Sequence, residues 1–126
     1  KLKINYVCCI FPASPLIKYN NIRKGYKKIV SKKYDFVFVA KKINSKNQKL
    51  FFLKNDKIKK FEKFNILNKT LATDAGQFYW GKKHSWMKNK TTFTKKTAFI
   101  ALDDFRAQDI NTYQDWNLSK LLFKLK

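Results

Sequence analysis

TDAGQFYWG, residues 73–81, is the stretch around which the rest of this chain is interpreted. Its glycine, Gly76, would let the backbone pass close to a neighbouring strand or a ligand. The next residues alternate as in a strand, so Gln77 and Tyr79 share one face and two large aromatic residues share the other. The aromatic face is typical of a protein core, whereas the face with Gln77 is polar enough to hold a ligand.

Three other apolar runs have the length of strands and predict a sheet around this stretch. Residues 6–11 form a continuous apolar run that ends at two prolines, which is typical of a buried central strand in a parallel sheet. Residues 36–40 and 97–102 are runs of the same kind. A helical pattern separates the first two runs, and the order strand, helix, strand predicts a parallel pair with a right-handed crossover.

Two helices are predicted from apolar periodicity. The first is capped by Asn20 or Asn21 and ends at about Ser31. The second opens with a capping box formed by Thr112 and Asp115. Its leucines recur at helical spacing, and we expect them to form a buried stripe: Leu118, Leu121, Leu122 and Leu125.

Residues 44–70 predict a small excursion from the sheet. Residues 49–53 and 57–61 have the pattern of two strands around Asn55 and Asp56, which tolerate the left-handed conformations of hairpin turns. The expected fold class is α/β, with a mostly parallel sheet and flanking helices. Residues 1–126 as a whole are interpreted as part of a single domain.

The charge of the chain bears on its partners more than on its fold. A formal charge of +21 arises from 29 Lys and Arg against 8 Asp and Glu, and only Arg23 and Arg106 are arginine. Proteins that grip phosphates or bases favour arginine for its bidentate geometry. Because the lysines are spread along the whole chain, we favour a solvated surface. A small lysine-rich nucleic-acid-binding protein stays as the alternative.

Cys8 and Cys9 are adjacent, so on a strand they point to opposite faces and cannot readily bridge each other or share a metal. We expect both to be small core residues of a cytoplasmic protein. No apolar run approaches the ~18 residues of a membrane span. No charged, apolar and small-residue leader precedes the first strand. His84, the single histidine, is expected at the surface and not at a metal.

Five of the eight acidic residues lie between Asp74 and Asp115. Carboxylates gathered at strand ends can hold Mg²⁺ together with substrate phosphates, as nucleotidyl transfer requires. The capping box explains Asp115, but it does not explain Asp109. We therefore take Asp109 as a candidate metal ligand.

Two stretches, DAGQFYWG at residues 74–81 and QDINTYQDW at residues 108–116, together resemble signatures of the bacterial pseudaminic acid cytidylyltransferases. These are relatives of the CMP-sialic acid synthetases. The resemblance implies a Rossmann-like nucleotide-diphospho-sugar transferase fold that moves CMP from CTP to pseudaminic acid or a related nonulosonic acid, for surface glycans or flagellin. It also implies Mg²⁺ as cofactor and a homodimer to which residues 44–70 contribute.

The resemblance also implies roles for single residues. Asp109 would be the catalytic, metal-binding aspartate. Asn111 would be a second metal ligand, in a place where the family has aspartate, and the loss of one negative charge should weaken Mg²⁺ binding. The residues that would bind the substrates are Gln77, Tyr79, Asp74, Lys49 and Ser14.

The chain also departs from the family pattern. Phe64 stands where relatives carry an arginine, and Thr73 where they carry a histidine. No stretch corresponds to the family's Ala-Arg-x-Gly-Ser-Lys loop, which cradles the CTP phosphates, and the chain enters a strand soon after Lys1. We therefore expect the C-terminal portion of a cytidylyltransferase, an incomplete fold without its N-terminal half that is inactive alone. A catalytically dead remnant is a further alternative.

Overall fold

The structure is a computed structural model, and it describes residues 3–31, 33–43, 51–54, 57–60 and 71–125. The chain divides into two compact units. The first comprises Lys1–Lys41 and Asp74–Lys126, and the second comprises Lys42–Thr73.

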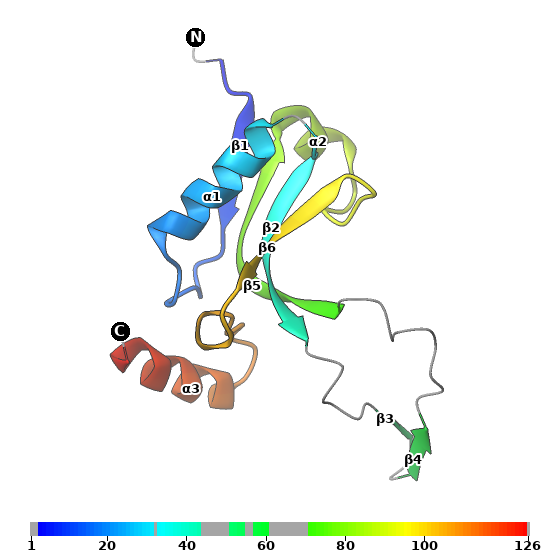
Figure 1. Ribbon diagram of the computed structural model, residues 1–126, viewed down its shortest axis with the longest axis vertical. Helices are drawn as coiled ribbons and strands as arrows, with labels where there is room; N and C mark the ends of the chain where they lie inside the picture. Colours follow the sequence, from blue (N-terminus) through cyan, green and yellow to red (C-terminus); the bar gives the residue numbers. More distant parts are fainter. Residues whose placement is uncertain (1–2, 32, 44–50, 55–56, 61–70, 126) are drawn as a thin grey trace. The chain divides into compact units, whose positions relative to one another are not determined.

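The first unit is built on a mixed sheet of four strands in the order β1-β5-β2-β6 (Figure 1). Their bounds are β1 Tyr6–Ile10, β2 Phe36–Ile43, β5 Leu71–Lys82 and β6 Thr97–Leu102. β1 pairs antiparallel with β5, and β2 pairs parallel with β6. The N–H of Lys82, at the end of β5, donates to the carbonyl of Asp35 just before β2. The end of β5 therefore lies beside the start of β2, and the two neighbouring strands are antiparallel.

This order confirms the α/β class and corrects two details of the prediction. Residues 6–11 were expected at the centre of a parallel sheet, but β1 is the end strand of the described sheet and pairs antiparallel. β1 and β2 were expected to pair directly, but β5 lies between them. The strand that carries the TDAGQFYWG stretch, β5, thus lies between the two strands that were predicted to be neighbours.

Helix α1, Tyr19–Val30, covers one face of the sheet (Figure 1). It packs closely because Gly25 leaves room for the indole of Trp80, whose Nε1 donates to the carbonyl of Ile22 at 3.0 Å. Ile29, near the end of α1, is fully buried. The N-cap is Lys18, without a side-chain cap, so the predicted asparagine cap is wrong and the helix starts two to three residues earlier.

The hydrophobic core lies between α1 and the sheet. It is centred on four buried residues from three strands, Val39, Ala75, Phe78 and Leu102. Partly buried apolar residues pack around this cluster: Cys8, Ile17, Ile22, Trp80, Ile100 and Ala107. As the alternation in β5 predicted, Phe78 and Trp80 face this core.

Three further elements belong to the first unit: α2 Lys83–Lys88, the 3-10 turn η2 Asp104–Arg106, and α3 Tyr113–Lys124. The capping box at the start of α3 is confirmed, because the side chains of Thr112 and Asp115 each accept from the other's backbone N–H. The predicted buried leucine stripe is wrong for three of its four leucines, and only Leu122 is half-buried. Leu121 is 61% exposed, Leu118 is also exposed, and Leu125 beyond the helix is 76% exposed, since nothing in the described part of the chain covers that side.

The second unit contains an antiparallel strand pair, β3 Phe51–Lys54 with β4 Lys57–Lys60. This agrees with the two strands predicted there. The turn residues Asn55 and Asp56, and most of residues 44–70, lie outside the described residues. A role of this excursion in dimer formation stays a prediction.

Both cysteines are free thiols, as expected. Cys8 packs against the core, where burial and then the neighbouring Cys9 raise the pKa of its thiol to about 11. Cys9 is exposed, so its prediction as a core residue is wrong. Within the described ranges, none of the helices has the length and apolar character needed to cross a bilayer.

Candidate active site

The two sequence stretches that were singled out meet at Gly76. Its φ is +58°, a conformation that favours glycine. A Cβ added at Gly76 would lie 2.2 Å from Oδ1 of Asp109, so the carboxylate of Asp109 sits directly against the glycine. The Gly76 N–H donates to Oδ1 of Asp74 at 3.0 Å. The peptide at Gly76 therefore has an aspartate on each side, one from β5 and one from the segment after β6.

Asp74 is held by a second donor, because the hydroxyl of Tyr79 donates to its Oδ2. The pKa of Asp74 is raised above its usual value, chiefly because burial disfavours the charged form. The negative charge of Asp109 also raises this pKa, whereas hydrogen bonds from the N–H groups of Gly76 and Ala75 lower it. The two carboxylates are thus close enough to repel each other.

Tyr79 is fixed by an aromatic cluster. Its ring stacks on Phe38, with centroids 5.7 Å apart and planes 9° apart. Phe11 and Phe93 contact the same ring at 5.5 and 6.2 Å. Tyr79 is buried, and these ring contacts fix the orientation in which its hydroxyl donates to Asp74.

Asn111 approaches Asp109 from the other side. Its Nδ2 donates to Oδ2 of Asp109 at 2.9 Å. The Asn111 backbone N–H donates to Oδ2 of Asp115, the capping-box residue of α3. Hydrogen bonds from Thr112 and Asn111 hold the pKa of Asp115 below its usual value, with the Thr112 hydroxyl as the largest cause. The helix start therefore positions the loop that carries Asp109.

Gln77 links β5 to the segment between β6 and α3 that carries Asp109. Its Nε2 donates to the carbonyl of Arg106, and the side chain is only 1% exposed. Oε1 of Gln77 and Nη1 of Arg106 are buried and have no hydrogen-bond partner among the described residues. A buried polar atom without a partner costs free energy, so this corner has unused capacity for a polar ligand or water.

Ser14 ties the proline-containing loop after β1 to the TDAGQFYWG stretch. Its Oγ lies 3.3 Å from the carbonyl oxygens of both Gly76 and Gln77. The N–H of Phe11 donates to the carbonyl of Gln77 at 2.9 Å. The loop that follows β1 thus packs against the Gly76 and Gln77 peptides, next to the two aspartates.

The donors gathered here suit a hard cation. Mg²⁺ is bound through one or two carboxylates, with waters and substrate phosphates as its other ligands. Asp74 and Asp109 provide two carboxylates around one peptide. In the described part of the chain, no group of three or more His, Cys, Asp and Glu residues could hold a metal ion. Two carboxylates alone do not make such a group, so any metal bound here would need its other ligands from water or a substrate.

Most of the predicted site residues are brought together. Asp74, Gln77, Asp109 and Asn111 surround Gly76 and its neighbouring peptides, and Ser14 buttresses them. Lys49 lies outside the described residues. Sequence reasoning missed Phe38 and Arg106 as supports of this site. Phe38 looks like any core strand residue, and Arg106 acts through its backbone carbonyl, which no side-chain pattern reveals.

No family model matches this chain. Among known proteins, it is similar to a pseudaminic acid cytidylyltransferase of Campylobacter jejuni strain 81-176, at 26% identity over 96% of this chain and 55% of the relative. The same-named protein of a second Campylobacter jejuni strain matches at 25% identity with the same coverage.

A Helicobacter pylori protein named pseudaminic acid cytidylyltransferase and UDP-2,4-diacetamido-2,4,6-trideoxy-beta-L-altropyranose hydrolase matches at 23% identity, over 90% of this chain and 23% of the relative. The chain spans about half the length of the two Campylobacter relatives. The resemblance predicted from the two stretches is therefore confirmed, and this chain is similar over nearly its whole length to the pseudaminic acid cytidylyltransferases.

Proposed function

We propose that this chain is part of a cytidylyltransferase that moves CMP from CTP to pseudaminic acid or a related nonulosonic acid. The observation that carries the proposal is the contact between Gly76 and Asp109. Gly76 and Asp109 lie 33 positions apart in the sequence, yet the two stretches that resemble the family signatures form one site with two carboxylates. The similarity of the chain to proteins of that name supports the same reaction.

In the proposed reaction, the anomeric hydroxyl of the sugar attacks the α-phosphorus of CTP. A new oxygen–phosphorus bond forms, the bond to the bridging oxygen of the β-phosphate breaks, and pyrophosphate leaves with that electron pair. The proton of the attacking hydroxyl is released to solvent. Bound Mg²⁺ would neutralise charge that develops on the phosphates. Asp109 is the residue we assign to the metal, and Asn111 orients its carboxylate through Nδ2.

Asp74 provides the second negative charge beside Asp109. The family's second aspartate is replaced here by Asn111, so Asp74 is the other carboxylate within reach of the same peptide. Gln77, Tyr79 and Lys49 are assigned to the sugar by resemblance, and Ser14 to the loop where the sugar and the cytidine approach. Gln77 and Tyr79 are buried, and we propose that they act by shaping this side of the site.

The finer fold assignment belongs to the same proposal. A mixed sheet with β1, β2 and β6 running in one direction and α1 on one face is compatible with a Rossmann-like nucleotide-sugar transferase. We also propose that the complete protein is a cytoplasmic homodimer and that its remaining part binds the CTP phosphates. The 126-residue chain should then be inactive alone.

The test is an assay of a longer protein that contains this chain, with CTP, Mg²⁺ and pseudaminic acid, following CMP-sugar and pyrophosphate. Asp109→Ala should lower turnover by about 100-fold or more, as expected when an electrostatic stabiliser is removed. Asp104→Asn is the matched control, because Asp104 is an exposed aspartate nearby whose contact is a loose ion pair with Lys41 at 3.6 Å. Turnover by the 126-residue chain alone would contradict the proposal, and a folded but inactive longer protein would indicate a remnant.

A further inference from the structure

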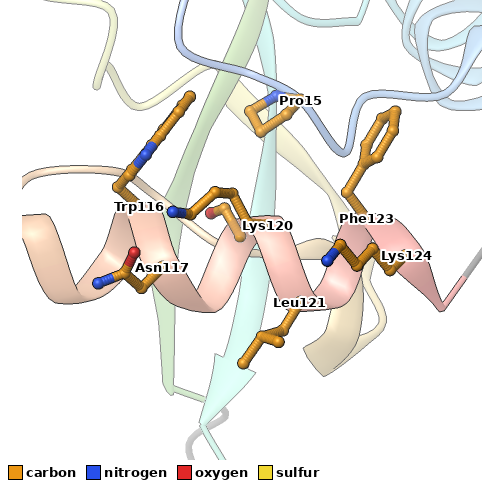
Figure 2. A pocket seen from close by; sticks show the side chains of 8 residues that line it. Pro15, Trp116, Asn117, Lys120, Leu121, Phe123 and Lys124 are labelled. Carbon is orange, nitrogen blue, oxygen red and sulfur yellow. The ribbon is translucent and has the colours of Figure 1, made fainter.

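A hollow of about 640 Å³ lies between helix α3 and the loop that follows β1. Pro15 lines it on the loop side, and its other described lining residues all belong to α3. Trp116, Ser119 and Phe123 recur at helical spacing, so they lie on one face of the helix. In Figure 2, Trp116 and Phe123 point toward Pro15 from that face. The volume is within the range of roughly 300–1,000 Å³ that is typical of small-molecule sites.

The walls of the hollow are apolar and only half covered. Trp116 is 48% exposed and Phe123 is 50% exposed. Large aromatic side chains dominate the energetics of binding, because each removes much apolar surface from water when a ligand covers it. The hollow therefore favours a ligand with a hydrocarbon chain or ring.

Two lysines of α3 supply the charges of the hollow. Lys120 and Lys124 are about one helical turn apart, so their ammonium groups can approach the same anion. Nζ of Lys120 lies 5.9 Å from the centre of the Trp116 ring, which places this charge beside the apolar wall. Among the described residues that line the hollow, none is Asp or Glu. The local charge therefore favours a ligand with a carboxylate or a phosphate.

A buried hydroxyl in the same hollow lacks a partner. Ser119 is 2% exposed, and its Oγ makes no hydrogen bond within the described part of the chain. Buried hydroxyls are normally hydrogen-bonded, because an unpaired one has lost its bonds to water without replacement. An oxygen atom of a bound ligand would supply the missing partner. The apolar walls, the two lysines and the unpaired hydroxyl thus point to one kind of ligand.

We propose that this hollow binds an amphipathic anion. Its hydrocarbon body would lie against Trp116 and Phe123, and its carboxylate or phosphate would lie between Lys120 and Lys124. A lysine ammonium is a compact point charge, which suits either headgroup. The site is separate from the candidate active site around Gly76, and the proposed function does not require it.

A second copy of this chain is the less suitable occupant. Each copy carries a formal charge of +21, so bringing two copies together is opposed by like-charge repulsion. The lysines on this face of α3 would also meet the lysines of the other copy. An anion with an apolar body meets no such barrier.

The experiment titrates the 126-residue chain with probes that share a ten-carbon chain and differ in charge: decanoate, decanol and decyltrimethylammonium. Calorimetry measures the affinity, and the indole N–H resonance of Trp116 reports the location. Decanoate should bind about tenfold more tightly than decanol, and decyltrimethylammonium more weakly than both. Decyl phosphate is the fourth probe, and the tighter binder of decyl phosphate and decanoate identifies the headgroup.

The double variant Lys120→Gln, Lys124→Gln tests the role of the charges. It should weaken decanoate binding by about tenfold and leave decanol binding unchanged, because only the contacts between opposite charges are lost. The double variant Lys24→Gln, Lys27→Gln is the matched control, since it removes the same charge from exposed positions on α1. It should leave both affinities unchanged. Ser119→Ala should weaken decanoate by about threefold without destabilising the chain, because it removes an unpaired buried hydroxyl.

Decanoate binding that shifts the Trp116 resonance and depends on Lys120 and Lys124 supports the inference. The inference is wrong if decanoate and decanol bind equally, or if the control double variant weakens decanoate as much as the α3 double variant does. A longer protein that contains this chain should also bind decanoate. Loss of binding there would show that polypeptide fills the hollow, and it would overturn the inference. None of these readouts uses CTP or Mg²⁺, so this inference and the proposed function can fail separately.

Discussion

The carboxylate of Asp109 fills the space that a side chain at Gly76 would occupy, with Oδ1 only 2.2 Å from the position of an added Cβ. Asp109 can take this position only because residue 76 has no Cβ. The same glycine has a φ of +58°. Conformation and contact thus both require glycine at this point, and they connect β5 to the loop that carries Asp109.

The first prediction concerns this contact. Gly76→Ala should destabilise the fold by about 1–2 kcal/mol from the left-handed conformation alone, with a further cost from the clash. Urea denaturation of the wild type and the variant measures the difference. Because the clash needs both partners, a double-mutant cycle with Asp109→Ala should recover part of the loss. A Gly76→Ala variant as stable as the wild type would show that Asp109 lies elsewhere.

Gly25 in α1 supports a second prediction, whose sign is opposite to helix propensity. Alanine in a helix interior is favoured over glycine by up to about 1 kcal/mol. At Gly25, however, an added Cβ would lie 2.6 Å from Cδ1 of Trp80 and 3.0 Å from Phe78. We expect Gly25→Ala to lower the free energy of unfolding by about 1–3 kcal/mol through overpacking.

Lys24→Ala is the matched control for Gly25→Ala, because Lys24 is exposed on the same helix. It should be neutral or slightly stabilising. Thermal or urea denaturation of both variants checks the contrast, and a stabilising Gly25→Ala would mean that α1 does not pack on Trp80 as described.

Sequence patterns were sufficient to predict most helices and strands, but they could not predict which strands are neighbours in the sheet. The strands at β2 and β6 and the Thr112–Asp115 capping box follow from local rules, because they depend on residues close in sequence. The insertion of β5 between β1 and β2 depends on pairing over long sequence distances, which no local pattern encodes. The leucines of α3 illustrate the same limit, since periodicity identifies a stripe but cannot say what covers it.

The site shows a similar division. Asp74, Gly76 and Asp109 could be singled out from residue types and a family resemblance. That the two aspartates share one peptide could not, because it depends on the turn after β6 folding back to β5. The burial of Gln77 and Tyr79 was likewise invisible, because alternation separates the faces of a strand without telling which face is covered.

The pKa of Asp74 gives a third prediction. It is raised above 3.8, mainly by burial, so the folded state binds a proton more readily than the unfolded state. The contribution of Asp74 to stability is therefore greatest below pH 3.8 and is lost as the pH rises through the raised pKa. Asp74→Asn should remove this dependence and make the protein more stable at neutral pH than the wild type.

Denaturation series between about pH 3.5 and 6 would measure the change for Asp74→Asn. Asp115 acts in the opposite direction in both proteins, because its lowered pKa stabilises the fold above pH 3.8 and this is lost on acidification. Asp104→Asn, an exposed change, should leave the profile as it is. An unchanged pH profile in Asp74→Asn would show that Asp74 is not buried beside Asp109.

The last prediction concerns the formal charge of +21 and the nucleic-acid alternative. A nucleic-acid interface favours several arginines at the surface. Of the two arginines here, Arg23 is exposed on α1, whereas Nη1 of Arg106 is buried. Fluorescence anisotropy with a labelled DNA duplex should show weak binding that disappears by ~0.15 M salt, as expected for diffuse lysine charge. Polyglutamate of similar length should compete as well as DNA, because both are then bound as polyanions. Binding that persists at this salt concentration, resists polyglutamate and falls steeply and linearly with log salt would instead identify a built nucleic-acid surface, and the lysines would need a functional explanation.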